Sequence, residues 1–466
     1  MNIRQTFNTI RQEKLFSTIY IVGTALAITF TMILSIIYYI HLADIYPEKN
    51  RSRTAYITSC VSKAVGKDGY QMYGPFSQFD MEDYFYKLKN VEAVSAYEDR
   101  DDSWYDDPYK YIPTPNGYKR VISLSTDPNF FRIYPYQFLG GQPFTWDDLH
   151  TSQKPFTWDN QHTSQRAAVI TDRLAADIFG PEADAVGQEF KLNDQDYRVC
   201  GVVKGGSSLL EHSYAEVFIP YKYIQDESWA ERNRSSHNGR LKITLMVKDN
   251  EQLHALKKEL EEIQRIWAVT DEPDFRGNTH TYHFTEKAFF THTNAAMFRA
   301  TGSGTQLEVQ EQPTEIGHIN MKNLRYILFV LLVLLVVPAV NLCGMVSSRM
   351  EERMAELGVR KSFGASRGTL FRQILSENLT LTLCGGILGL LLSWIALGTG
   401  RVSIFSMFMN PMMVRECPNL TGSMLFSPLI FLAAFLLCCI LNLLAALLPA
   451  WWNLRKPIVE SMMREK

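Results

Sequence analysis

The chain has 466 residues, a formal net charge of -2 and a hydrophobic fraction of 46%. This length exceeds what one hydrophobic core organises, so we expect at least two structural units. The charge balance gives no reason to expect nucleic acid as a partner, because a polyanion would require a basic face. Mean hydropathy is near neutral at -0.12, yet the apolar residues concentrate in four long runs, which predicts a membrane protein.

The first apolar run covers residues 15–40 and contains no charged side chain. A helix of this length crosses a hydrocarbon core of about 30 Å, so we predict the first transmembrane helix here. The run is too long for a signal-peptide core, and the small residue expected two positions before Ala43 is missing. We therefore expect a retained anchor, preceded by a cytoplasmic N-terminus at residues 1–14.

Residues 41–320 are predicted to form one large extracytoplasmic α/β domain. Its first part lies within residues 45–115 and begins with a strand-like stretch from Thr54 to Val61. Asp80 is the expected N-cap of a helix that continues through Leu88, and a second strand follows at Val91 to Tyr97. This order is typical of a βαβ unit.

The last part of this domain, residues 240–300, repeats the pattern. Alternating apolar residues from Leu241 to Val247 predict a half-buried strand, and Asp249 with Gln252 resembles a capping box. His280 to Thr285 is the expected returning strand, so the two parts together predict a small split βαβ sheet. One face of the intervening helix is formed by Leu253, Leu256, Leu260, Ile263 and Trp267.

Residues 116–239 predict a β-rich insert between these two parts, with a tight turn at residues 193–196. Residues 143–153 recur almost unchanged as residues 155–165. Two copies are too few for a solenoid, so we expect a surface loop that tolerated insertion, with ligand binding as the alternative. The strands expected in the insert are 121–124, 167–171, 189–193, 197–203 and 217–220.

The seven cysteines include no CxxC pair and no zinc-type spacing, so they form no metal or redox motif. No catalytic residue, cofactor or metal is expected in this chain. Cys60 and Cys200 both lie in the outside domain, and their spacing leaves open whether they form a disulfide. His280 with His283 is a weak metal candidate against a plain strand surface. The acidic stretch from Glu98 to Asp107 is expected to be a solvated loop, with calcium binding as the alternative.

The second apolar run, residues 324–348, leads into a basic segment at residues 349–376. Apolar residues recur there at helical spacing among charged ones, which predicts an amphipathic helix at the membrane surface. Gly364 suits the C-terminal stop of this helix, and Ser366 can cap a second helix that runs into the third apolar run. The segment is therefore predicted to be a helical hairpin.

The third and fourth runs, residues 377–400 and 425–452, complete four predicted spans. Basic residues are dense in the hairpin and in the tail at residues 453–466, but sparse in the loop at residues 401–424. The positive-inside rule then places the hairpin and both termini in the cytoplasm. Four buried helices of a soluble protein are the disfavoured alternative, because the runs are too long.

The hairpin resembles the loop between the first two helices of the C-terminal membrane module in MacB/FtsX-type ABC permeases. Leu357 replaces the isoleucine usual in this family, and 449–458 resembles the family's Pro-Ala ending. The insert is also similar to the MacB extracytoplasmic domain at residues 140–144, 175–180, 186–187 and 197–203. The matching hairpin residues are Arg353, Glu356, Gly358, Arg360, Lys361, Gly364 and Ala365, followed by Gln373, Glu377, Gly385, Gly386 and Gly389.

This resemblance implies that the first seven of these residues, Arg353 to Ala365, couple the chain to a nucleotide-binding partner. It also implies a permease dimer, of identical or different chains, whose outside domain has porter-like (45–115 and 240–300) and sabre-like (116–239) parts. ATP hydrolysis would move these parts by mechanotransmission. A basic belt against anionic lipid headgroups is the alternative role of the hairpin.

The chain contains no G-x-x-x-x-G-K-[ST] motif, so the ATPase is expected on a separate chain of an inner-membrane complex. The leading hypothesis is a permease subunit for efflux or extraction at the outer membrane face, acting with a periplasmic adaptor and an outer-membrane exit duct. The alternative is an FtsX-like regulator that activates an envelope hydrolase or a sensor kinase. A membrane-bound enzyme or receptor has no supporting motif, since neither G-x-S-x-G nor H-E-x-x-H occurs.

Overall fold

The architecture comes from a computed structural model of the whole chain. The chain divides into two compact units, a helical unit built from residues 1–40, 321–411 and 420–466 and an outside unit built mainly from residues 41–320. The structure describes residues 14–58, 60–64, 71–98, 109–115, 117–151, 166–181, 184–210, 212–221, 237, 239–267, 280–284, 289–291, 359–360 and 362–406, with scattered helical positions in 325–350 and 432–447.

Two long helices dominate the described part of the helical unit. Helix α2 covers Lys14–Leu42 and helix α12 covers Arg367–Thr399; the short α13 (Arg401–Ser406) follows. Among the described residues these are the two helices long and apolar enough to cross a bilayer. They contain the predicted span 15–40 and all but the last residue of the predicted span 377–400. The predicted spans 324–348 and 425–452 lie largely outside the described residues and stay predictions.

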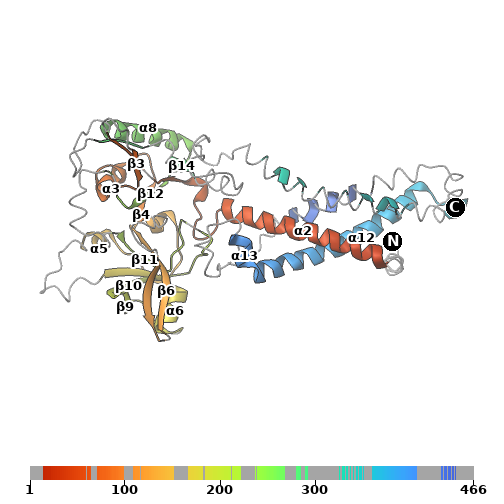
Figure 1. Ribbon diagram of the computed structural model, residues 1–466, viewed down its shortest axis with the longest axis horizontal. Helices are drawn as coiled ribbons and strands as arrows, with labels where there is room; N and C mark the ends of the chain where they lie inside the picture. Colours follow the sequence, from red (N-terminus) through yellow and green to blue (C-terminus); the bar gives the residue numbers. More distant parts are fainter. Residues whose placement is uncertain are drawn as a thin grey trace. The chain divides into compact units, whose positions relative to one another are not determined.

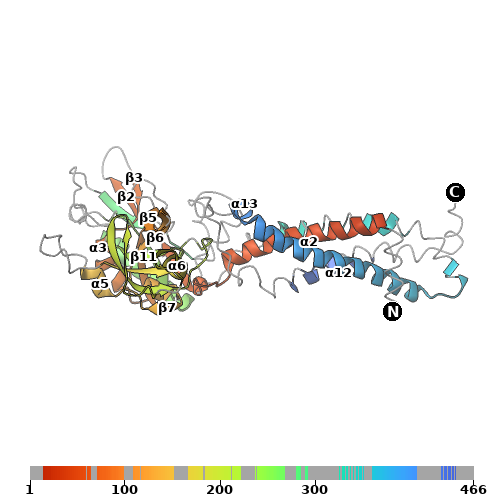
Figure 2. The ribbon, with the colours of Figure 1, turned by 90° about the horizontal axis from the view of Figure 1, so that it is seen from below.

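Helices α2 and α12 pack side by side through small residues (Figures 1 and 2). A Cβ atom added at Gly389 would lie 2.7 Å from the carbonyl oxygen of Ala25, and one at Gly385 would lie 2.8 Å from the Cβ of Thr24. The Oγ1 of Thr29 also donates to the carbonyl oxygen of Gly389 at 3.1 Å. This G-x-x-x-G spacing therefore permits close backbone approach, as in other membrane helix pairs.

The outside unit contains an eleven-stranded mixed sheet and a separate three-stranded sheet, in the order β13-β2-β3. The path through the large sheet is β14-β1-β12-β4-β6-β11-β8-β10-β7, with β5 paired to β6 and β9 paired to β10 (Figure 1). The strands are β1 (Thr54–Ile57), β2 (Cys60–Ala64), β3 (Gln71–Gly74), β4 (Ala93–Glu98), β5 (Tyr109–Thr114), β6 (Gly117–Thr126), β7 (Phe138–Gly141), β8 (Arg166–Thr171), β9 (Glu189–Leu192), β10 (Gln195–Val203), β11 (Val217–Pro220), β12 (Leu241–Met246), β13 (His280–Phe284) and β14 (Phe289–Thr291).

The split βαβ sheet is present, but its returning strand differs from the prediction. Strand β12 lies between β1 and β4 and is antiparallel to both, and β1 lies between β12 and β14. The predicted returning strand, residues 280–285, is β13 and joins β2 in the small sheet instead. The single strand predicted from Thr54 to Val61 is likewise wrong, because β1 and β2 belong to different sheets. The alternation of apolar and polar residues along one strand does not indicate which sheet the strand joins.

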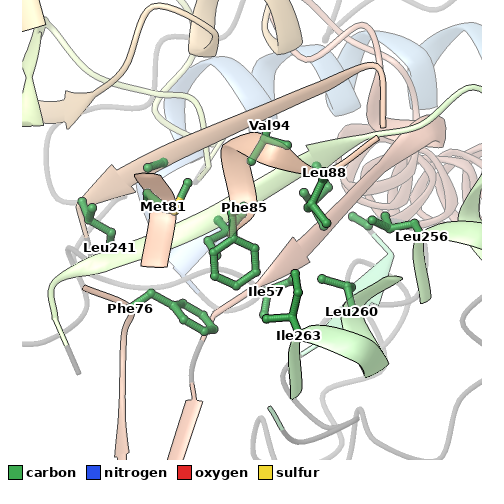
Figure 3. Packing of buried hydrophobic residues seen from close by; sticks show 14 of the residues in the cluster. Ile57, Phe76, Met81, Phe85, Leu88, Val94, Leu241, Leu256, Leu260 and Ile263 are labelled. Carbon is green, nitrogen blue, oxygen red and sulfur yellow. The ribbon is translucent and has the colours of Figure 1, made fainter. Parts of the chain in front are cut away.

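Two helices cover one face of this split βαβ part. Helix α3 (Gln78–Asp83) continues into a short 3-10 turn at Phe85–Lys87, and α8 covers Asn250–Trp267. Figure 3 shows Phe85 among the apolar side chains gathered between these helices and the sheet. All five residues predicted on the inner face of α8 are buried. The predicted helices are confirmed, although the first one ends as an α-helix five residues before Leu88.

The predicted half-buried strand, β12, is buried on both faces. One face packs under α3 and α8, while Thr244 and Met246 are buried on the other face, where Met246 joins the cluster around Phe130 and Phe131. Strand β12 is therefore a central, fully buried strand, although its alternating apolar and polar residues are typical of a half-exposed strand. The pattern arises because buried Lys242 and Thr244 occupy the second face.

Two local predictions near chain turns have different outcomes. The tight turn is confirmed, since Asn193 and Asp194 both have positive φ and join β9 to β10 as a two-residue hairpin. Asp80 is not the N-cap of α3. Ser77 is the cap, and Asp80 accepts from the Ser77 backbone in a reciprocal capping box.

The predicted insert is not a separate sheet. All five predicted strands are present as parts of β6, β8, β9, β10 and β11, and they continue the same sheet through β4. Short helices accompany them at Phe130–Ile133 (α4), Trp146–Thr151 (α5) and Asp172–Phe179 (α6). Cys60 and Cys200 are free thiols, so the structure contains no disulfide between them.

The first copy of the tandem duplication is not the predicted surface loop. It forms α5, and its Phe144 and Leu149 are buried. The second copy has Gln161 where the first has Leu149, and it lies outside the described residues. An amide cannot replace an apolar side chain in a dry core without an unfavourable desolvation, so the two copies are not interchangeable.

Candidate coupling hairpin

The hairpin turn follows residues Val359 and Arg360. The backbone N–H of Phe363 donates to the carbonyl oxygen of Val359 at 3.1 Å, and that of Ala365 donates to Arg360 at 3.0 Å. Gly364 has a φ of +91°, a conformation that L side chains rarely adopt. The first helix therefore stops at Gly364, as the sequence predicts.

The second arm of the hairpin starts at once. The Oγ of Ser366 accepts from the backbone N–H of Thr369, and α12 begins at the next residue, Arg367. This confirms the predicted cap, and the second arm is continuous with residues 377–399, where the third span is predicted. Because α12 is one helix of 33 residues, it is about 50 Å long, against about 30 Å of hydrocarbon. The part of α12 beyond this thickness forms the second arm of the hairpin.

A chain of side-chain hydrogen bonds joins the two arms. The Nη1 of Arg360 donates to the Oε1 of Gln373 at 3.0 Å, and the Nε2 of Gln373 donates to the Oε1 of Glu377 at 3.3 Å. Glu377 is buried, and one residue later the Nδ2 of Asn378 donates to the carbonyl oxygen of Ile374 at 3.0 Å. The guanidinium is thus fixed to the helix that enters the third span.

Apolar contacts anchor the base of the hairpin within the helical unit. Ala365 and Phe371 pack against a buried cluster formed by α2, α12 and residues 346–350. Its members are Tyr20, Val346, Met350, Leu370, Ile374 and Leu381. The turn therefore packs through apolar side chains where it meets the helices, while Phe363 at its tip is 87% exposed.

Three of the seven predicted coupling residues are described: Arg360, Gly364 and Ala365. The other four, Arg353, Glu356, Gly358 and Lys361, lie outside the described residues. Gln373 and Glu377 form part of the hydrogen-bonded chain but were not among the predicted coupling residues. Their spacing of four residues on one helix was the available signal.

The outside unit contains a separate concavity of about 540 Å3 between α5 and the end of β11. Its lining includes Tyr86, Trp146, Leu149 and Tyr221, so the first copy of the duplication supplies two of the lining residues. The volume falls in the range of small-molecule sites, and ligand binding stays a prediction here.

No group of three or more potential metal ligands occurs among the described residues. The side chains of His280 and His283 are outside the described set, as is most of the acidic stretch after Glu98. The alternatives of a metal site and a calcium site therefore stay untested predictions.

Comparison with known families matches both ends of the chain. The profile of the MacB-like periplasmic core domain family matches residues 17–263, more than half of the chain. The profile of the FtsX-like permease C-terminal family matches residues 328–457, which include the hairpin and α12.

Two curated relatives illustrate the similarity. The ABC transporter permease YknZ of Bacillus subtilis is 24% identical over 265 residues, covering 57% of this chain and 56% of the relative. The macrolide export ATP-binding/permease protein MacB of Shewanella oneidensis is 24% identical over 343 residues, covering 72% of this chain and 42% of the relative. The chain thus spans about half the length of these curated relatives.

A solved structure of the periplasmic region of MacB from Actinobacillus actinomycetemcomitans is 12% identical, with a TM-score of 0.33. The match covers 55% of this chain and 95% of that one, and a score this low supports no argument on its own. The two sequence profiles carry the assignment: this chain belongs to the family of MacB/FtsX-type ABC transporter permeases.

Proposed function

We propose that this chain is the permease subunit of an ABC transporter whose ATPase is a separate chain, and that it converts ATP hydrolysis into movement of its outside unit. The observation that carries this proposal is the hydrogen-bonded chain from Arg360 through Gln373 to Glu377. It attaches the tip of a cytoplasmic hairpin to a helix that continues without a break to Thr399. A push on the hairpin would therefore move α12 as a rigid rod.

The helix pair offers a route from α12 to α2. Gly385 and Gly389 bring the two backbones together, and the hydroxyls of Tyr20 and Thr382 lie 3.1 Å apart across the pair. Such close contact resists sliding of one helix along the other. Helix α2 continues to Leu42, directly before the outside unit. Movement of α12 would thus reach the outside unit through α2.

The proposed topology has four spans, with both termini and residues 349–376 in the cytoplasm. Arg360 and Lys361 support this arrangement, because burying both at the bilayer centre would cost roughly 5 to 7 kcal/mol. Protection of the Arg360–Lys361 bond from trypsin added to inverted vesicles, in the absence of a partner, would contradict it.

We propose efflux, or extraction of a substrate at the outer face of the cytoplasmic membrane, as the purpose of this movement. Two relatives are named for macrolide export and pyoverdine export. A permease dimer, a periplasmic adaptor and an outer-membrane exit duct are the partners that this function would use. The large outside unit favours transport over a purely regulatory role.

The second candidate is an FtsX-like regulator, and the match of residues 328–457 to the FtsX-like profile supports it. In this role the same movement would activate an envelope hydrolase or a sensor kinase. Purification of the complex in mild detergent separates the two candidates. Recovery of a hydrolase or kinase favours regulation, and recovery of an adaptor favours export.

The coupling assignment is tested by comparing Arg360→Ala with Arg372→Ala in the purified complex. Loss of a charge-assisted hydrogen bond is worth about 1.5–3 kcal/mol, so Arg360→Ala should lower ATP hydrolysis or ATPase recovery about tenfold or more. Arg372 is exposed on α12, in the second arm of the hairpin, and serves as the control. Equal losses in both variants would favour the alternative of a basic belt against lipid.

A further inference from the structure

The first residues of the outside unit contain a buried ion pair. The Nε of Arg51 lies 2.6 Å from the Oε2 of Glu48, and the two side chains are only 4% and 1% exposed. Both residues follow closely after Leu42, the last residue of α2. A buried charge pair is costly to desolvate, so its presence at this point calls for a physical reason.

Each partner of this pair also holds a backbone group. The Nη1 of Arg51 donates to the carbonyl oxygen of Ala43, the residue directly after α2, at 2.9 Å. The Oε1 of Glu48 accepts from the backbone N–H of Ser213 at 3.1 Å. The ion pair therefore links the residue that follows α2 to the loop between β10 and β11, about 170 positions along the chain.

Other side chains of residues 43–51 also bond to the insert. The Oη of Tyr46 donates to the carbonyl oxygen of Lys204 at 2.6 Å and accepts from the backbone N–H of Gln137 at 3.1 Å. The Nδ2 of Asn50 donates to the carbonyl oxygen of Ile133 at 2.9 Å. All of these distant partners belong to residues 116–239, the insert, although the covalent chain leads from this segment into β1.

The fixed geometry that a charged pair imposes on its partners explains its presence here better than a contribution to folding stability does. Replacing a buried ion pair with apolar side chains of similar volume is often neutral or stabilising. Apolar packing, however, has no preferred direction, whereas charge-assisted hydrogen bonds hold their partners in a fixed geometry. Residues 43–50 thus have the properties of a stiff joint.

We propose that Glu48 and Arg51 are positioning residues that deliver movement of α2 to the insert directly, bypassing β1 and the split βαβ part. This inference rests on the proposed function, because it assumes that α2 moves during ATP hydrolysis. It assigns two segments, the α4 region at residues 129–137 and the region at residues 204–214, together called both loops below, as the first parts of the outside unit to respond.

The test compares hydrogen–deuterium exchange with and without ATP and vanadate in the full complex with its ATPase. In the wild type, uptake in the peptides covering both loops should change on ATP addition. In the double variant Glu48→Gln/Arg51→Met, which leaves no unpaired charge, this change should be lost while ATP hydrolysis is retained. A purely structural role would instead leave the response intact or impair folding and hydrolysis together.

Arg265→Met is the control, because Arg265 pairs with Glu262 on α8 at 2.8 Å, away from residues 43–51. It should leave the ATP response of both loops unchanged. If the double variant fails to fold, Tyr46→Phe removes only the hydroxyl that bonds Lys204 and Gln137 and should weaken the response of the same loops.

If the double variant folds and its exchange response to ATP is unchanged, the inference is wrong. If the double variant does not fold, an unchanged response in Tyr46→Phe has the same meaning. Either result leaves the proposed function standing. A wild-type complex that hydrolyses ATP without any exchange change in the outside unit overturns both. The two failures are therefore distinguishable.

Discussion

The interiors of the two units differ in the side chains that make the closest contacts. The outside unit buries large aromatic residues such as Trp267, Phe130 and Phe218. The closest contacts between α2 and α12 involve glycine and hydroxyl residues, with Gly389 against Ala25 and Tyr20 against Thr382. In water, apolar area drives burial, whereas in lipid close backbone contact and hydrogen bonds hold helices together. The comparison indicates which solvent each unit is built for.

The surface of the helical unit fits the same comparison. Helix α2 exposes large apolar side chains along much of its length, among them Leu15, Val22, Leu26 and Phe30. A continuous apolar surface of this kind is typical of contact with lipid or with another span. The predictions below test whether the two interiors respond differently to substitution.

The largest effect is expected in the aromatic core of the outside unit. Phe130 is fully buried and contacts the rings of Phe131, Tyr134 and Phe218. Phe130→Ala should lower the free energy of unfolding of this unit by about 3–5 kcal/mol, because it removes apolar contact and leaves a cavity. Denaturant-dependent proteolysis of the detergent-solubilised chain measures this. Tyr118→Ala, at a side chain that is 75% exposed, is the control, and similar losses in both variants would contradict the assigned core.

The next effect depends on pH and concerns a carboxylate within the same unit. Burial raises the pKa of Asp127 to about 6, although Tyr86 and the backbone N–H groups of Ala96 and Phe130 hydrogen-bond to it. The folded state therefore binds a proton more tightly than the unfolded state between about pH 4 and pH 6. This stabilisation is fully present below about pH 4 and is lost as the pH rises through 6, by up to about 3 kcal/mol.

Asp127→Asn should flatten this pH dependence, measured as the free energy of unfolding from pH 4 to pH 7. Exposed Asp147 provides the control, since Asp147→Asn should leave the wild-type slope unchanged. A wild-type protein whose stability rises steadily over this range would count against a buried, protonated Asp127.

The smallest effect compares two glycines on α12. A Cβ at Gly389 would lie 2.7 Å from the Ala25 carbonyl oxygen, whereas one at Gly398 meets nothing within 4 Å. Gly389→Ala should therefore destabilise the helix pair by about 1–3 kcal/mol. Gly398→Ala should stabilise the chain by up to about 1 kcal/mol through helix propensity. Thermal unfolding of the full chain in detergent measures both, and shifts of the same sign would refute the packing of α2 on α12.

The local features of the hairpin were predictable because they depend on a few adjacent residues. Gly364 stops one helix and Ser366 starts the next, and both roles follow from backbone conformation alone. The cap of α3 was misassigned even though Ser77 and Asp80 stand in capping-box spacing, a signal present in the sequence.

Long-range pairings were harder to predict from the sequence. Strands β13 and β14 both follow α8, and no pattern within them indicates which one returns to β1. The joint at Glu48 and Arg51 was also missed, because its partner Ser213 lies in a distant loop. Isolated charges near a membrane helix are typical of interfacial residues, and only the fold shows that these two side chains are buried.

The sequence by itself determined the apolar helices, most strands of the insert and the hairpin turn, because these features follow from hydrophobic periodicity and local capping. Only the tertiary structure decided that the insert extends the same sheet as the split βαβ part, that β12 is buried on both faces, and that Arg360 bonds Gln373. The physical reason is that pairing and burial depend on residues far apart in the chain, whose proximity no local pattern encodes.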